Sequence, residues 1–213
     1  MWQKIQHCGL YSITDCTLAQ RSHADIVSAL IAGGARLIQL REKRLASGAF
    51  YAEAQAAVTI AHQAGASIII NDRVDIAALV GADGVHLGQE DMHPEKARSL
   101  LGENAIIGLS THSLAQAQIA NSLPIDYIAL GPIFATETKK SASQNVPGGQ
   151  IGLELLSQVA AMVDKPIVAI GGITLANARA VRAAGANAVA VISDLLKYDN
   201  IEKRAREFLD KLS

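Results

Sequence analysis

The chain has 213 residues, of which 50% are hydrophobic and 4% aromatic, and its formal net charge is −1. This length fits one large domain, and the near-neutral charge gives no reason to expect nucleic acid or an anionic membrane as a partner. No apolar run approaches the roughly 20 residues of a membrane span, and the polar start lacks the form of a signal peptide. The two cysteines, Cys8 and Cys16, have no C-x-x-C spacing, which favours reduced thiols and a cytoplasmic location.

Short runs of apolar and β-branched residues recur along the chain and predict eight β-strands. These runs cover residues 9–14, 36–41, 67–71, 84–88, 105–111, 127–133, 166–172 and 188–193. Segments between them have apolar residues three or four positions apart and predict helices, for example over 23–34, 46–65 and 175–185. The strands read as nearly continuous hydrophobic runs, which is typical of parallel strands buried on both faces.

The alternation of strands and helices predicts an α/β protein, a single-domain (β/α)8 TIM barrel over residues 1–213. An open doubly wound sheet is the alternative, but no G-x-G-x-x-G follows the first strand, where such sheets usually bind a dinucleotide. Gly-Ala pairs such as Gly81-Ala82 close four of the predicted helices, because glycine readily adopts the left-handed conformation that ends a helix. The longest irregular stretch, 134–150, is expected to be a mobile loop that acts as a lid.

Two carboxylates follow neighbouring strands of this predicted barrel. Asp72 comes directly after the third strand and Asp91 after the fourth, and the carboxyl ends of all strands meet around one opening. Carboxylates held close together repel unless a cation or a proton lies between them, and an all-oxygen environment favours Mg²⁺ over Zn²⁺. The structural alternatives are that Asp72 caps the next helix and that Asp91 is only a turn residue.

Cationic and small residues at other strand ends indicate phosphate-bearing ligands. Arg41, Lys43 and Lys139 supply the charges that a diphosphate needs. Gly171-Gly172 exposes backbone N–H groups near Ile192-Ser193, where barrels often hold a monophosphate after their last two strands. Plainer interpretations are a solvated charge run for the cations and a tight turn for the glycines.

Two histidines allow more than one interpretation. His86 lies in an apolar context and is interpreted as a core histidine with satisfied hydrogen bonds rather than as a ligand or a base. His112 follows the fifth strand, and it either faces the barrel mouth or begins a surface helix.

Six motifs at the strand ends resemble those of the thiamine phosphate synthase family and occur in the family's order. They are QLREK (39–43), INDRVDIA (70–77), ADGVHLGQEDM (82–92), IGLSTHS (107–113), GPIFATETKK (131–140) and AIGGI (169–173). The resemblance implies a (β/α)8 enzyme of thiamine biosynthesis. It would join 4-amino-2-methyl-5-hydroxymethylpyrimidine diphosphate to 4-methyl-5-(2-phosphoethyl)thiazole, or to the carboxylated form of this thiazole, and release pyrophosphate.

The resemblance also implies a role for each matching residue. The expected ligands of the pyrimidine diphosphate are Gln39, Arg41, Lys43, Asn71, Ser110 and Lys139. Within this set the expected catalytic residues are Arg41, Lys43, Ser110 and Lys139. The expected Mg²⁺ ligands are Asp72 and Asp91. The expected thiazole phosphate site consists of Thr136, Thr138, Gly172, Ile192 and Ser193.

Two rival functions stay open at this point. A thiazole tautomerase of the same superfamily would need a catalytic histidine in the loop after the sixth strand, where this chain has Thr136-Glu137-Thr138. It would also not need the carboxylate pair. A non-catalytic barrel that only binds phosphate ligands would have no reason to keep that pair opposite three cations. The sequence leaves the oligomeric state open, a homo-oligomer included.

Overall fold

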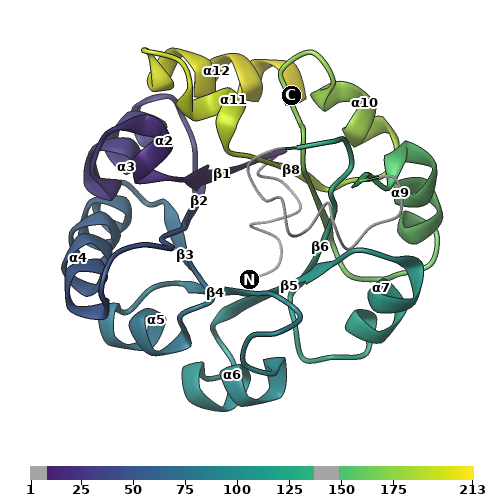
Figure 1. Cartoon of the computed structure of the whole chain (residues 1–213), viewed down its shortest axis with the longest axis horizontal. Helices are drawn as coiled ribbons and strands as arrows, with labels where there is room; N and C mark the ends of the chain where they lie inside the picture. Colours follow the sequence, from purple (N-terminus) through teal and green to yellow (C-terminus); the bar gives the residue numbers. More distant parts are fainter. Residues whose placement is uncertain (1–8, 137–148) are drawn as a thin grey trace.

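The computed structural model describes residues 9–136 and 149–213. Its strands are all parallel and form a closed barrel in sequence order, in which β8 pairs with β1 (Figure 1). The predicted (β/α)8 fold is therefore confirmed, and the open sheet was the wrong alternative. The strands are β1 (Gly9–Thr14), β2 (Leu37–Leu40), β3 (Ser67–Asn71), β4 (Gly84–Leu87), β5 (Ile106–Thr111), β6 (Tyr127–Leu130), β7 (Ile167–Ile170) and β8 (Ala188–Val191).

The helices form a ring around the barrel, as Figure 1 shows. They are α2 (Cys16–Ala19), α3 (His23–Ala32), α4 (Ser47–Gln63), α5 (Val74–Val80), α6 (Pro94–Leu101), α7 (Leu114–Asn121), α9 (Gly152–Ala160), α10 (Ala178–Ala183), α11 (Ser193–Leu196) and α12 (Ile201–Leu212). Gly81 ends α5 in the left-handed conformation with φ +64°, as the Gly-Ala pair predicts. The predicted mobile loop over 134–150 contains residues 137–148, which lie outside the described residues, so its mobility stays a prediction.

Three strands end two or three residues earlier than predicted, and each of these ends has a local cause. β6 stops at Leu130 because Pro132 has no N–H to continue the ladder. β7 stops at Ile170 because Gly171 and Gly172 both adopt positive φ. β8 stops at Val191 because the chain turns directly into α11. These early ends leave the segments after β6, β7 and β8 free to shape the barrel mouth.

The apolar core has two layers. The larger layer lies between the strands and the helices, and it includes side chains such as Ile38, Ile70 and Val85. The smaller layer fills the barrel interior with residues that alternate with the first set along the strands, among them Ile13 and Ile69. Burial on both faces explains why the strands read as continuous hydrophobic runs.

Two tyrosines make the inner layer partly polar. The rings of Tyr11 and Tyr127 meet edge to face with centroids 5.8 Å apart, and both side chains are buried. Gly108 provides the space, because a Cβ atom there would lie 2.0 Å from Cζ of Tyr127. The barrel interior therefore carries two phenolic hydroxyls below the mouth.

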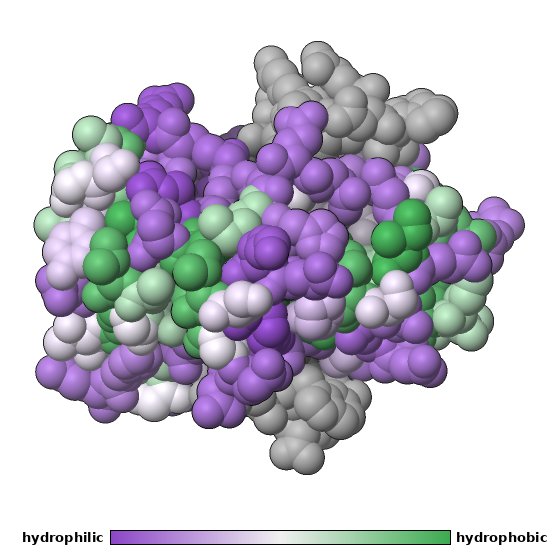
Figure 2. All heavy atoms as spheres, turned by 90° about the horizontal axis from the view of Figure 1, so that it is seen from below, coloured by the Kyte–Doolittle hydropathy of each residue, from purple (hydrophilic) through white to green (hydrophobic). Residues whose placement is uncertain are grey.

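The outer surface carries hydrophilic and hydrophobic side chains side by side over the helices. Figure 2 shows one side of the barrel, on which green and purple areas alternate. The most exposed large hydrophobic side chains are Leu79, Leu100 and Ile119. Among the helices that the structure describes, none is long and apolar enough to cross a membrane.

Candidate active site

A cleft of about 870 Å³, its open mouth included, lies at the carboxyl end of the barrel. The side chains around it come from most of the strands and from the segments that follow them. Eight residues that the sequence predicts for the site line this cleft: Gln39, Arg41, Asn71, Ser110, Thr136, Gly172, Ile192 and Ser193. The fold thus gathers residues up to 154 positions apart in the sequence at one site.

A chain of hydrogen bonds crosses the floor of the cleft. Gln39 donates its amide to the Tyr11 hydroxyl over 3.1 Å, and the Tyr11 and Tyr127 hydroxyls lie 2.9 Å apart. His86 continues the chain, with Nδ1 2.9 Å from the Tyr127 hydroxyl and Nε2 2.9 Å from Oγ of Ser110. Buried polar groups that are bonded to one another in this way hold fixed orientations. The floor can therefore present Gln39 and Ser110 in defined positions to a ligand.

The interpretation of His86 as a core residue is only half right. Its two ring nitrogens are bonded and its side chain is 7% exposed, but it also lines the cleft. His86 stands beside Asn71 in the β3–β4 register, so strand parity puts both residues on the inner face. His112 also lines the cleft, and its Nδ1 lies 2.6 Å from the Gly131 carbonyl oxygen. The surface-helix alternative for His112 is therefore wrong.

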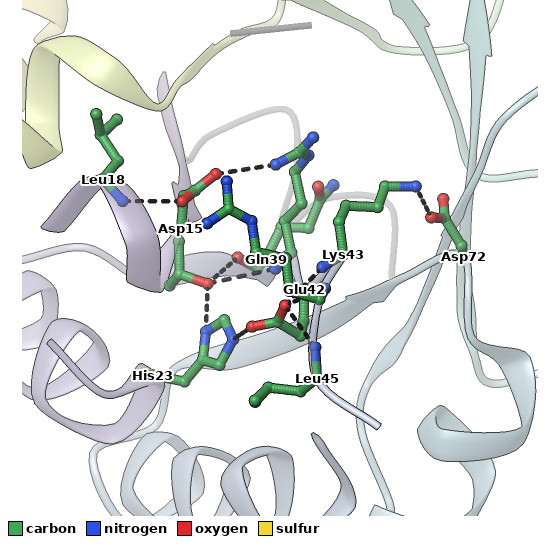
Figure 3. Close-up of polar contacts among 11 residues, drawn as sticks. Asp15, Leu18, His23, Gln39, Glu42, Lys43, Leu45 and Asp72 are labelled. Carbon is green, nitrogen blue, oxygen red and sulfur yellow. Dashed lines mark hydrogen bonds and ion pairs between the residues drawn. The ribbon is translucent and has the colours of Figure 1, made fainter. Parts of the chain in front are cut away.

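Two cations near the mouth are each paired with a carboxylate. Arg41 donates to Oδ2 of Asp15 over 2.9 Å, and Asp15 also caps α2 by accepting the Leu18 N–H (Figure 3). Lys43 forms an ion pair with Asp72. Arg41 lines the cleft, whereas Lys43 and Asp72 lie beyond its lining, on the side of β2 and β3. Sequence reasoning missed the contact between Arg41 and Asp15, because it depends on the directions of two side chains that follow different strands.

The two carboxylates predicted for a metal lie next to each other. Burial raises the pKa of Asp91 above its ordinary value, and a hydrogen-bonding contact with Asp72 raises it further, while the Gly88 N–H and Lys43 act in the opposite direction. The cap alternative for Asp72 is wrong, because α5 has no side-chain cap. The turn alternative for Asp91 is right as far as it goes, since Asp91 accepts the Gly88 N–H over 2.7 Å. Crowded oxygens of this kind fit a hard divalent cation.

Small residues form the opposite wall of the cleft. Gly172 has φ +62°, and a Cβ atom there would lie 2.7 Å from Cβ of Phe134 and 2.7 Å from the Ala135 oxygen. The segment after β6 therefore packs directly on the segment after β7, which leaves room beside Ile192 and Ser193. Thr138 and Lys139, which the sequence also predicts for the site, lie outside the described residues.

The chain matches the family model described as "Thiamine monophosphate synthase" over residues 10–195. A thiamine-phosphate synthase of Azorhizobium caulinodans is 44% identical over 198 residues, covering 92% of this chain and 91% of that protein. One of Methanospirillum hungatei is 43% identical over 204 residues, covering 95% and 97%. The solved structure of a thiamine phosphate pyrophosphorylase from Pyrococcus furiosus has a TM-score of 0.87 and 34% identity, covering 98% and 96%.

The family match spans nearly the whole barrel, including the carboxyl ends of all eight strands around the cleft. The curated relatives are well above 30% identical and cover most of each chain. The resemblance in the six strand-end motifs is thereby confirmed, and the chain belongs to the thiamine monophosphate synthase family.

Proposed function

We propose that the protein condenses 4-amino-2-methyl-5-hydroxymethylpyrimidine diphosphate with 4-methyl-5-(2-phosphoethyl)thiazole to give thiamine phosphate and pyrophosphate. The observation that carries this proposal is one cleft with two unlike walls. Arg41 lines the cleft toward β2, with Lys43 and the carboxylate pair beyond the lining on that side, and Gly172, Ile192 and Ser193 line it toward β7 and β8. Such a cleft suits a diphosphate on one side and a monophosphate on the other.

Asp72 and Asp91 are the residues that would hold Mg²⁺ in this proposal. Their contact and the raised pKa of Asp91 fit a site that favours added positive charge. Mg²⁺ typically binds through one or two carboxylates together with substrate phosphates. When bound, it would neutralise charge on the diphosphate.

The reaction needs no protein nucleophile. The C–O bond to the diphosphate breaks first, and the pyrophosphate leaves with the electron pair. The electron-rich aminopyrimidine stabilises the resulting carbocation, and the thiazole nitrogen then forms the new C–N bond. Arg41 and Lys43 would offset the negative charge that grows on the leaving group.

The floor of the cleft would orient the pyrimidine. Gln39 and Ser110 are fixed by hydrogen bonds through the two tyrosines and His86. Each of these five residues is less than a tenth exposed. Holding the two substrates in line makes their bimolecular reaction effectively unimolecular. A closed floor also limits the access of water, which would otherwise capture the carbocation.

The Mg²⁺ requirement should depend on pH. Protons and Mg²⁺ compete for Asp91, whose pKa is raised, so the Mg²⁺ concentration for half-maximal rate should increase as pH falls toward that pKa. At higher pH the carboxylate stays ionised and the requirement should level off. Initial rates over a grid of pH and Mg²⁺ concentration measure this effect. Asp91→Asn lacks this carboxyl and reports the pH dependence of all other groups and of the substrates, so an identical pH dependence in both proteins would contradict the role of Asp91.

Ser193→Arg should block the monophosphate side of the cleft. The longer side chain would occupy the space beside Gly172 and Ile192, so KM for the thiazole phosphate should rise at least about tenfold, equivalent to about 1.4 kcal/mol. KM for the pyrimidine diphosphate should change by less than about twofold. Ser193→Ala is the matched control, because it keeps the space and removes only the hydroxyl. Equal changes in both KM values would contradict the assignment of this wall.

The condensation itself is tested by the mass of the product. The purified full chain should convert the two substrates to thiamine phosphate when Mg²⁺ is present, and neither substrate alone should give it. Conversion of the carboxylated thiazole, measured in parallel, establishes which form the enzyme accepts. If the thiazole were altered in the absence of the pyrimidine, the tautomerase would be the better assignment, and binding of both substrates without a product would indicate a non-catalytic barrel.

A further inference from the structure

Three potential metal ligands meet behind the ends of β1 and β2, outside the lining of the cleft. Cys16 is the first residue of α2, His23 is the first residue of α3, and Glu42 follows β2. One ligand atom from each of them lies within 4.8 Å of the other two. The three residues come from separate segments that the barrel brings together, so their proximity is a product of the fold.

The hydrogen bonds of His23 leave one of its ring nitrogens facing this cluster. His23 is fully buried, and its Nδ1 lies 2.8 Å from Oγ1 of Thr14 (Figure 3). The Thr14 hydroxyl donates to the backbone carbonyl oxygen of Gln39 over 3.2 Å and accepts the backbone N–H of Arg41 over 3.3 Å. A hydroxyl has one proton; with that proton directed to Gln39, Nδ1 is the donor to Thr14 and Nε2 of the neutral ring carries a lone pair. Nε2 has no partner within hydrogen-bond distance among the described residues, and its one polar contact is the longer ion pair with Glu42 that Figure 3 draws.

Glu42 turns an uncommitted oxygen toward this lone pair. Its Oε1 accepts the backbone N–H groups of Lys43, Arg44 and Leu45, over 2.7, 2.6 and 3.1 Å. Its Oε2 lies 3.5 Å from Nε2 of His23, which is long for a hydrogen bond. Two ligands at about 2.1 Å from a tetrahedral zinc ion are roughly 3.4 Å apart. The spacing is therefore suited to a cation between the two atoms.

The surrounding charges also favour a cation. Burial, together with the carboxylates of Glu42, Glu53 and Asp15, raises the pKa of the Cys16 thiol to about 12. Burial lowers the pKa of His23, against the pull of the same three carboxylates. A neutral imidazole among converging carboxylates leaves negative charge that an added cation can neutralise.

We propose that Cys16, His23 and Glu42 bind a divalent cation of the zinc class, at a site separate from Asp72 and Asp91. A sulfur, an imidazole nitrogen and a carboxylate oxygen are ligands that Zn²⁺ accepts and Mg²⁺ does not prefer. As the S–Zn bond forms, the Cys16 thiol releases its proton to the buffer, so the affinity should increase with pH. Because Glu42 also holds residues 43–45, the ion would fasten the segment that carries Arg41 and Lys43.

Metal binding to the full chain tests the proposal without either substrate. The metal-stripped protein should take up one equivalent of Zn²⁺ in the presence of excess Mg²⁺. Co²⁺ in place of Zn²⁺ should produce a thiolate-to-metal absorption band. Cys16→Ser should remove that band and weaken Zn²⁺ binding by at least about tenfold, and His23→Gln should weaken binding similarly.

Two control variants make the test specific. Cys8→Ser changes the other cysteine of the chain and should keep the band, and Asp72→Asn should keep Zn²⁺ binding. Cys16→Ser is a nearly isosteric change, so it decides the outcome if His23→Gln does not fold. Absence of a tightly held equivalent, or a band that survives Cys16→Ser, would overturn the proposal.

Discussion

Asp91→Asn is expected to reduce kcat by about 100-fold, equivalent to about 2.7 kcal/mol of transition-state stabilisation, and to flatten the dependence of the rate on Mg²⁺. The carboxylate of Asp91 contacts that of Asp72, and this pair supplies the negative charge for the proposed metal site. Asparagine removes that charge but keeps an oxygen that can accept the Gly88 N–H, so the local turn should persist. Initial rates over a range of Mg²⁺ concentrations measure both effects.

The neighbouring residue provides the control for this substitution. Glu90 is exposed and also carries a carboxylate, so Glu90→Gln removes the same charge one position away and should leave kcat within about twofold of its original value. Thermal unfolding of both variants without metal checks that the fold is intact. A response to Mg²⁺ in Asp91→Asn identical to that of the unsubstituted protein would remove Asp91 from the metal site.

Gly172→Ala is expected to raise KM for the thiazole phosphate by tenfold or more, a loss of at least about 1.4 kcal/mol in binding. The new Cβ atom would lie 2.7 Å from both Cβ of Phe134 and the Ala135 oxygen. Backbone cannot yield as a flexible side chain does, so the segment that leads to Thr136 must shift. Steady-state kinetics with each substrate varied in turn would locate the loss on the thiazole side.

An alanine at positive φ also destabilises the fold, and Gly81→Ala measures this effect separately from the clash. Gly81 has φ +64°, against +62° at Gly172, but a Cβ atom at Gly81 meets nothing within 4 Å. Both variants should lose about 1–2 kcal/mol of stability from the left-handed conformation. Only Gly172→Ala should change KM. A similar KM change in both variants would show that the loss comes from general destabilisation and not from the wall of the cleft.

The barrel could be predicted from the sequence because its strands are buried on both faces and are separated by helices with a clear apolar stripe. The contact between Asp72 and Asp91 could also be predicted, since neighbouring parallel strands end at the same rim. Both predictions depend on local patterns repeated in order along the chain. The early ends of β6 and β7 arise from proline and from paired glycines, whose local effect on strand length is harder to judge.

The hydrogen-bonded floor of the cleft could not be predicted from local sequence patterns. A continuous apolar run hides which residues face inward, so Tyr11, Tyr127 and His86 read as ordinary core residues. Their role follows from the register between β1, β5, β6 and β4, which the sequence does not state. The pairing of Arg41 with Asp15 and the approach of Cys16 to Glu42 likewise depend on side-chain directions at separate strand ends.

Release of pyrophosphate is the measurement that tests the proposed reaction most directly. The purified protein should be assayed with both substrates and Mg²⁺, and then with each of these three components omitted in turn. The proposed function predicts one pyrophosphate for each thiamine phosphate formed, and background release in every omission. Pyrophosphate release that does not require the thiazole phosphate, or no release with all components present, would contradict it.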